Sequence, residues 1–477
     1  MKYLKNNLIE RKVEKVLSWV ITHILKPMTV LPMTMVFLGC SDFVEVDPPK
    51  NTLISETVFK DPVTVESAFA HIYHSMREKG LVSGNAGLTT LMGIYSDELD
   101  YYGFDADFLQ FYHHNIVADN TSITGWWSHA YNLIYSANNI IEGVAGSDVL
   151  RLEDRNKFHG QALFVRAYVH SLLVSLYGDI PYVTTTDYLV NNSVSRVPEA
   201  KVYENIIADL EESVDLLEGI EDISDERVLP DQWTVKALLA RMYLYTEQWE
   251  AAEVISTQLL GAFALEPDLN EVFLKGSSET IWQLKPGENL RNTQEANQLI
   301  IQFIPGQTYA LTDSLMESFE IGDQRSVHWT ASISDTDNTV TLQFAHKYKA
   351  LFNETESLEY SILFRLGEQH LIRAEARVYL GNLAEAQQDL NVIRNRAGLA
   401  NTTANTVNDL LESILHERRV ELFAEQGHRW FDLKRTGSAT AVLGPVKSNW
   451  KATDILFPIP EIELESNPNL LPQNQGY

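Results

Sequence analysis

The chain has 477 residues, of which 45% are hydrophobic and 21% charged, which is typical of a folded globular protein and excludes disordered and fibrous classes. Its 37 basic and 65 acidic residues give a formal net charge of −28, which argues against general nucleic-acid binding because such binding needs cations against phosphate. The single cysteine, Cys40, excludes intrachain disulfides, and no apolar run reaches the roughly 20 residues of a membrane-spanning helix.

The first 39 residues have the pattern of a secretory signal. A basic segment precedes the apolar run Val30–Leu38, and a small residue comes directly before Cys40. The tetrapeptide FLGC that ends at Cys40 resembles a bacterial lipobox, although Phe37 and Leu38 stand where leucine and a small residue are usual. We predict a signal peptide at residues 1–39 and lipidation of Cys40; a buried structural cysteine is the alternative.

Residues 40–60 are predicted to hold the lipidated N-terminus and a tether. Pro48 and Pro49 favour extended backbone here, because each proline fixes φ and removes an N–H donor. The main domain is then expected to span residues 61–477.

Helical periodicity dominates the chain from residue 61 onward. Asp61-Pro62 is typical of an N-cap followed by a first-turn proline. Apolar residues then recur at helical spacing in the segments 65–76, 127–141 and 162–176. Gly178 and the proline that follows it predict the end of the third helix.

Two later segments predict closely packed helix pairs similar to tetratricopeptide (TPR) repeats. In residues 237–252 and 369–397, small residues recur at helical spacing around a short turn, which lets two helices approach closely. Residues 261–353 lie between them and are irregular, with Ile281–Leu284 and Thr339–Phe344 as predicted short strands. We expect a loop-rich insert here, and loops often carry function.

The sequence contains little that indicates catalysis. It lacks a P-loop and the GxGxxG, GxSxG and HExxH motifs. The pair His113-His114 would point in different directions on a helix, which disfavours a shared metal. Asp97-Glu98, and Glu317 with Asp323, are candidate glycosidase carboxylates, but 65 acidic residues supply such pairs by chance. We therefore expect no catalytic residue, no metal and no cofactor.

Several motifs, in a shared order, resemble the SusD/RagB family of outer-membrane lipoproteins from Bacteroidetes. They are FVRAY at 164–168, YGD at 177–179, RAEA at 373–376, LNVIRNRAG at 390–398, ERRVEL at 417–422, GHRWFDLKR at 427–435, FPIP at 457–460, NPNL at 467–470 and QNQGY at 473–477. Two positions depart from the family pattern: Gln426 replaces its usual glutamate and Gln475 its usual proline.

The resemblance implies a mainly α, SusD-like fold, with about four TPR-like helix pairs and a loop-rich region with a few short strands. It also implies a lipid-anchored protein of the outer membrane, facing the cell exterior. Such a protein captures oligosaccharides and delivers them to a SusC-like TonB-dependent transporter, without catalysis. The same fold binding peptides or another nutrient is the first alternative, and a glycoside hydrolase is the second.

Two features are interpreted in the light of this resemblance. The acidic stretch at residues 42–47 is similar to the surface-export signal of Bacteroidetes lipoproteins, and a solvated linker is the other interpretation. The charged motif at 417–421 is expected to form ion pairs at close helical spacing, with Arg429 and Arg435 tying that helix to the chain end. This motif therefore predicts scaffold rather than chemistry.

Aromatic residues divide into expected core and expected ligand contacts. Trp127, Tyr168, Tyr243 and Trp430 lie within helical motifs and are expected in the core. A ligand platform is expected instead in loops, because exposed aromatic clusters are costly without a use.

The candidate platform is the stretch that follows Asp97-Glu98. Its predicted ligand contacts are Tyr101, Tyr102 and Phe104, with Tyr309 and Trp329 as an opposite wall and Asp100 and Arg325 as polar contacts. The alternative, which stays open, is that residues 101–104 only pack the loop onto the helical core.

Overall fold

The structure is a computed structural model that describes residues 58–220, 226–287 and 291–477. The described residues belong to one compact unit, Ser55–Tyr477. The predicted signal peptide, Cys40 and the tether up to residue 57 lie outside the described residues. Phe59, which the prediction placed in the tether, is buried against Gly143 of a long helix.

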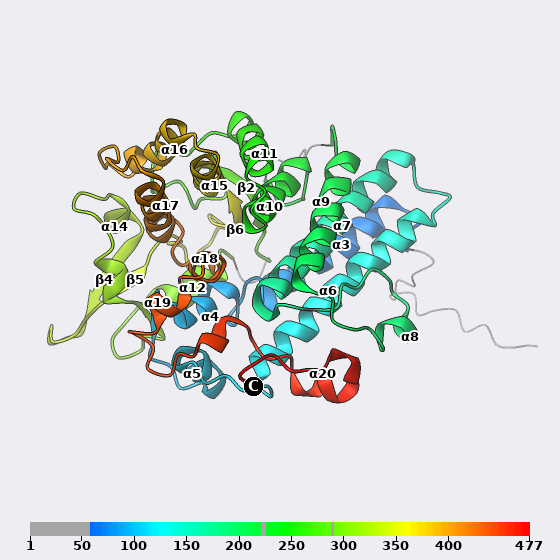
Figure 1. The fold of residues 1–477 in the computed structure, drawn as a ribbon, viewed down its shortest axis with the longest axis horizontal. Coiled ribbons are helices and arrows are strands. Elements are labelled where there is room, and N and C mark those ends of the chain that lie inside the picture. The colour runs from blue at the N-terminus through cyan, green and yellow to red at the C-terminus, as the bar shows by residue number, and fades with distance from the viewer. Residues whose placement is uncertain (1–57, 221–225, 288–290) are drawn as a thin grey trace, which may run out of the picture. The chain divides into compact units, whose positions relative to one another are not determined.

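A first group of helices lies side by side in Figure 1. It comprises α3 (Pro62–Glu78), α6 (Thr121–Ala145), α7 (Leu152–Tyr177) and α9 (Glu199–Leu216). The local signals act as predicted: the Asp61 carboxylate accepts a hydrogen bond from the Val63 N–H at 3.0 Å, and α7 ends at Gly178, whose φ is 72°.

A second group contains the predicted TPR-like pairs. Helix α10 (Gln232–Tyr245) is followed by α11 (Trp249–Ala262), and α15 (Leu366–Tyr379) by α16 (Leu383–Arg396), each across a loop of three residues. Such short loops force the two helices to pack against each other. Helix α17 (Val407–Glu421) packs beside α15 and α16, so the predicted mainly α fold with TPR-like pairs is confirmed.

Short helices and turns connect these groups. They are α4 (Leu88–Tyr95), α5 (Ala106–His113), α8 (Tyr188–Asn191), α12 (Gln294–Leu299), α13 (Asp313–Met316), α14 (Arg325–His328), α18 (His428–Arg435), α19 (Ala439–Leu443), α20 (Glu461–Ser466) and the 3₁₀ turns η3 (Ala452–Ile455) and η4 (Pro468–Leu470). No helix among the described residues is both long and apolar enough to cross a membrane.

The described strands form three antiparallel pairs. They are β1 (Leu99–Tyr101) with β3 (Tyr309–Leu311), β2 (Thr280–Leu284) with β6 (Ser361–Arg365), and β4 (Thr330–Ser334) with β5 (Thr341–Ala345). The predicted strands at 281–284 and 339–344 correspond to β2 and β5. The β1–β3 pair was not predicted, because three-residue strands carry too little alternation to be recognised.

The core is rich in aromatic side chains. Trp127, Tyr168, Tyr243 and Trp430 are all buried, as predicted. Trp282 of β2 lies in contact with Tyr168 of α7, with ring centroids 5.8 Å apart, and thereby ties the sheet to the first helical group.

Candidate functional site

The candidate site is built on the β1–β3 ribbon, which joins two segments about 200 residues apart in sequence. Tyr101 pairs with Tyr309 in register, and the ladder continues one step further, where the Tyr102 N–H donates to the Thr308 carbonyl at 2.9 Å. At the opposite end the Thr312 N–H donates to the Glu98 carbonyl at 3.0 Å. Because the pairing is antiparallel, the residues after Tyr102 and before Thr308 leave the ribbon at the same end.

Three exposed aromatic residues lie on the two segments that leave this end of the ribbon. Phe104 is 96% exposed, Phe303 63% and Tyr102 39%. The Phe303 ring lies against Gly306, where a side chain would collide with it. We call Tyr102, Phe104 and Phe303 the aromatic platform. Phe303 was missed by the sequence analysis, since only the β1–β3 pairing places its loop at the same end of the ribbon as Phe104.

Tyr101 and Tyr309 pack against each other next to the platform residues in sequence. Their ring centroids are 5.6 Å apart and both side chains are buried. The Tyr101 hydroxyl accepts a hydrogen bond from the Asp105 N–H at 3.2 Å. Tyr309 was predicted to lie on a wall opposite Tyr101, with both as ligand contacts, whereas the structure pairs the two buried residues on one ribbon. Tyr101 instead fits the packing interpretation that the sequence left open.

The surroundings of the platform are acidic. Burial raises the pKa of the Tyr102 hydroxyl, and the negative charges of Asp100 and Asp313 raise it further. The Asp100 carboxylate is half-buried and accepts a hydrogen bond from the Tyr112 hydroxyl at 2.9 Å. A ligand at this surface therefore meets apolar ring faces beside carboxylates, which disfavours anionic ligands.

The residues directly before β1 are held by side chains of α17 and α18. Arg429 donates two hydrogen bonds to the Asp97 carboxylate, at 2.7 and 2.9 Å, and Arg419 donates a third at 2.7 Å. Glu98 is buried beside them and accepts from the Ala424 N–H at 3.4 Å. These contacts immobilise the ribbon. They also leave the Asp97-Glu98 pair unsuited to glycoside hydrolysis, because Asp97 is paired with arginines and Glu98 is shielded from solvent.

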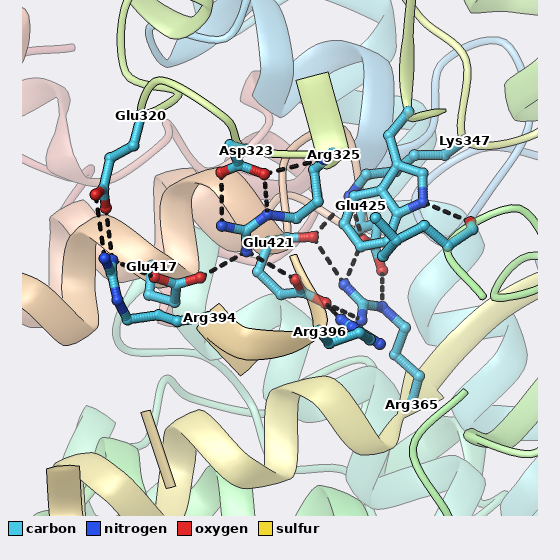
Figure 2. A network of polar contacts seen from close by, with 12 residues as sticks. Glu320, Asp323, Arg325, Lys347, Arg365, Arg394, Arg396, Glu417, Glu421 and Glu425 are labelled. Carbon is cyan, nitrogen blue, oxygen red and sulfur yellow. Dashed lines mark hydrogen bonds and ion pairs between the residues drawn. The ribbon is translucent and has the colours of Figure 1, made fainter. Parts of the chain in front are cut away.

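Arg325 and Trp329 do not belong to the platform, which corrects their prediction as ligand contacts. Figure 2 shows Arg325 inside a network of charged side chains, where it contacts Asp323 at 2.8 Å and Glu417 at 2.7 Å. The Trp329 indole N–H donates to the Leu269 carbonyl at 2.8 Å. Both side chains are fully buried, because long-range partners neutralise the guanidinium and satisfy the indole.

The same network corrects the expectation for the motif at 417–421. Its charges pair with distant residues rather than along the helix: Glu421 contacts Arg325 at 2.9 Å, Arg365 at 2.6 Å and also Arg396. Burial alone would raise the pKa of Glu421, but the three guanidinium groups hold it well below its usual range. Helix α17 therefore presents its charges to the core as scaffold (Figure 2).

The two other arginines of this region also bind partners that were not predicted. Arg429 binds Asp97 rather than the chain end, and Arg435 binds Glu375 at 2.6 Å and Asp432 at 2.8 Å. Over the part of the chain that the structure describes, no three histidine, cysteine or acidic side chains come together in a way that could hold a metal ion.

Comparison with known proteins gives consistent similarities over most of the chain. Residues 42–244 match a family model described as "Starch-binding associating with outer membrane", and residues 284–453 match the model of the SusD family. SusD-like protein P2 of Formosa agariphila is 27% identical, over 94% of this chain and 99% of that protein.

Solved structures share the fold. A SusD superfamily protein from Bacteroides vulgatus superposes with a TM-score of 0.80 at 21% identity, over 88% of this chain and 100% of that one. A laminarin-binding SusD-like protein gives 0.74 at 23% identity, over 88% and 100%. Surface glycan-binding protein A from Bacteroides fluxus gives 0.70 at 23%, over 87% and 99%.

Proposed function

The chain belongs to the SusD/RagB family, and from this premise we propose that it is a glycan-binding protein whose ligand lies on the aromatic platform. The observation that carries the proposal is the set of three exposed aromatic residues at one end of a ribbon that partly buried arginines hold in place. The fold neighbours described as laminarin-binding and as a surface glycan-binding protein support the same ligand class.

The chemistry of the platform fits a neutral oligosaccharide. The C–H faces of a pyranose ring pack on aromatic side chains, and the amphipathic Tyr102 adds a hydroxyl at the edge of the contact. A rigid ribbon loses little conformational entropy on binding. Asp100 and Asp313 accept hydrogen bonds from sugar hydroxyls but repel sulfate and carboxylate groups, so neutral glycans are favoured over anionic ones.

The cellular role follows from family membership. We propose that the protein is anchored in the outer membrane through lipidated Cys40, faces the cell exterior and delivers captured oligosaccharide to a SusC-like TonB-dependent transporter. It acts by binding, without catalysis or a cofactor. Purification in mild detergent from the native host tests the partnership: a large β-barrel protein is expected to co-purify, and its consistent absence would contradict the transporter role.

The double variant Tyr102→Ala/Phe104→Ala tests the platform. Removing both rings is expected to weaken glycan binding about tenfold or more, because ring stacking and apolar contact are lost together. Retardation in native gels that contain laminarin, amylopectin or the sulfated polysaccharide carrageenan measures binding. Neutral polysaccharides are expected to retard the wild-type protein more than carrageenan does.

Tyr379→Ala is the matched control, because Tyr379 is 49% exposed and lies on α15, away from the platform. Its variant should bind as the wild type does. The melting temperature of the double variant should change little, since exposed substitutions rarely alter stability. Wild-type binding by the double variant would contradict the platform, and stabilisation by peptide mixtures but by no polysaccharide would assign a peptide cargo instead.

A further inference from the structure

A second concave surface lies on α6, outside the platform. A cavity of about 620 Å³ opens between α6, the loop around α8, and α20, three segments that Figure 1 shows close together. A volume of this size is typical of small-molecule sites. None of the residues that line it belongs to β1, β3 or the aromatic platform.

Aromatic side chains one helical turn apart form the α6 wall of this cavity. Trp127 and Tyr131 lie at its base, with ring centroids 5.0 Å apart, and Tyr135 is 51% exposed at its edge. The Tyr131 hydroxyl donates to the Pro181 carbonyl at 2.9 Å, so this ring has a structural partner. Tyr135 is therefore the ring that remains available to a ligand.

The polar side chains of the wall are hydrogen-bonding groups that suit sugar hydroxyls. Ser128, Asn132 and Asn192 are exposed and line the cavity. These three side chains form no hydrogen bond with another residue of the described part of the chain. Glu463 lies opposite, half-buried, and its burial raises its pKa. The amides offer both a donor and an acceptor to a ligand.

A second cavity on the other side of α6 extends this surface. It has a volume of about 470 Å³ and shares Ser128, Asn132 and Tyr135 with the first cavity. His129 lines it and is buried, and its Nε2 atom has no hydrogen-bond partner among the described residues. Burial lowers the pKa of His129 to about 4, so this nitrogen is neutral at physiological pH.

We propose that this α6 surface is a second carbohydrate-binding site. A glycan segment lies across α6, stacks on Tyr135 and places hydroxyl groups in both cavities, against the exposed side chains of Ser128 and Asn132. The inference takes its ligand class from the proposed function, but its position is independent of the platform. Two sites on one chain raise the avidity for a long polysaccharide by making the second contact intramolecular.

Two variants test the site in native gels that contain laminarin or amylopectin. Tyr135→Ala removes the stacking ring, and Ser128→Trp fills the space that both cavities share; both positions are exposed, so folding is expected to persist. Each variant is expected to bind about tenfold more weakly than the wild type. Tyr379→Ala is again the control, with the melting temperature measured for every variant.

The outcomes separate the two sites. Weaker binding of both α6 variants, with the control unchanged, supports the second site. Wild-type binding by both α6 variants, with loss in Tyr102→Ala/Phe104→Ala, overturns the second site and leaves the proposed function standing. Loss in the α6 variants alone supports the second site and overturns the platform as the ligand surface. A wild-type protein that neither polysaccharide retards overturns both proposals.

Discussion

Individual charged residues are the least expected feature of this core. Arg325, Arg365 and Glu421 are fully buried, although charged side chains usually stay in water. Their desolvation is offset because each guanidinium faces several carboxylates at hydrogen-bonding distance. Such a network fixes the relative positions of α17, β6 and α14, since a displaced partner would leave a charge unpaired.

Arg325→Met tests this network at the level of one residue. The variant leaves Asp323, Glu417 and Glu421 without one of their cations, and breaking a buried pair typically costs about 3–5 kcal/mol of unfolding free energy. Urea denaturation measures the loss. Arg151→Ala is the control, since Arg151 pairs with Asp154 at an exposed site and its removal should leave stability unchanged. Equal stability of the two variants would contradict the role of the network.

Glu98, which lies directly before β1, makes the stability of the folded protein depend on pH. Burial and the neighbouring charge of Asp97 raise its pKa from 4.5 to about 8, so the folded protein keeps this carboxyl protonated. A raised carboxyl pKa gives stability that is fully present below pH 4.5 and is lost as the pH rises to about 8.

Glu98→Gln should therefore remove this part of the pH dependence. The amide cannot ionise, and its oxygen can still accept from the Ala424 N–H. At pH 8 the variant is expected to be more stable than the wild type by on the order of 3 kcal/mol, and at pH 4 the two should be equal. Urea denaturation at both pH values measures this; parallel pH profiles for the two proteins would contradict the assignment.

At the scale of single elements, local capping determines where the scaffold helices begin. The Asp231 carboxylate accepts hydrogen bonds from the N–H groups of Trp233 and Thr234, both at 2.9 Å, and so begins α10. Helix α10 then pairs with α11 across residues 246–248. A local signal of this kind is readable in the sequence because its partners lie two and three residues away.

Asp231→Ala should lower the unfolding free energy by about 1 kcal/mol, because two N–H groups of the first turn lose their acceptor. Asp231→Asn keeps an acceptor oxygen and is expected to remain within a few tenths of a kcal/mol of the wild type. Thermal and urea unfolding of the two variants measure the difference. A loss in the asparagine variant as large as in the alanine variant would point to charge, rather than capping, as the cause.

At the scale of the whole molecule, the C-terminal segment returns to the first helical group. The Phe457 N–H donates to the Leu176 carbonyl at 2.9 Å, and the Asn474 amide donates to the Tyr177 carbonyl at 2.8 Å. The Arg196 guanidinium donates to the side-chain Oδ1 atom of Asn474 at 2.5 Å. The FPIP and QNQGY motifs thus contact the C-terminal end of α7, where the YGD motif begins.

Membrane attachment is a property of the whole molecule that Cys40 is predicted to provide. Cys40→Ala should release the protein from the membrane fraction, because the acyl chains would no longer be attached. Fractionation of native-host cells followed by immunoblotting measures this. The platform variant Tyr102→Ala/Phe104→Ala is the control and should stay membrane-bound. Equal membrane retention of Cys40→Ala would contradict the lipid anchor.

Local patterns in the sequence were sufficient to predict the helical architecture and the family. Helix periodicity, caps and small-residue patterns depend on residues within about one or two turns, so the segments that became α3, α6, α7, α10 and α15 were predictable. The four core aromatics were predictable for the same reason, because their helical spacing indicates a buried face. The ordered motifs identified the family without any knowledge of contacts.

Which side chains are available to a ligand depends on contacts between segments that are distant in the sequence. Arg325 and Trp329 looked like loop residues, yet partners distant in sequence bury both. Phe303 and Phe104 lie at the same end of the ribbon only because β1 pairs with β3. Tyr135 borders two cavities only because α3 approaches α6 on one side, and α8 and α20 approach it on the other. Burial and strand pairing depend on contacts across hundreds of residues, which local periodicity does not encode.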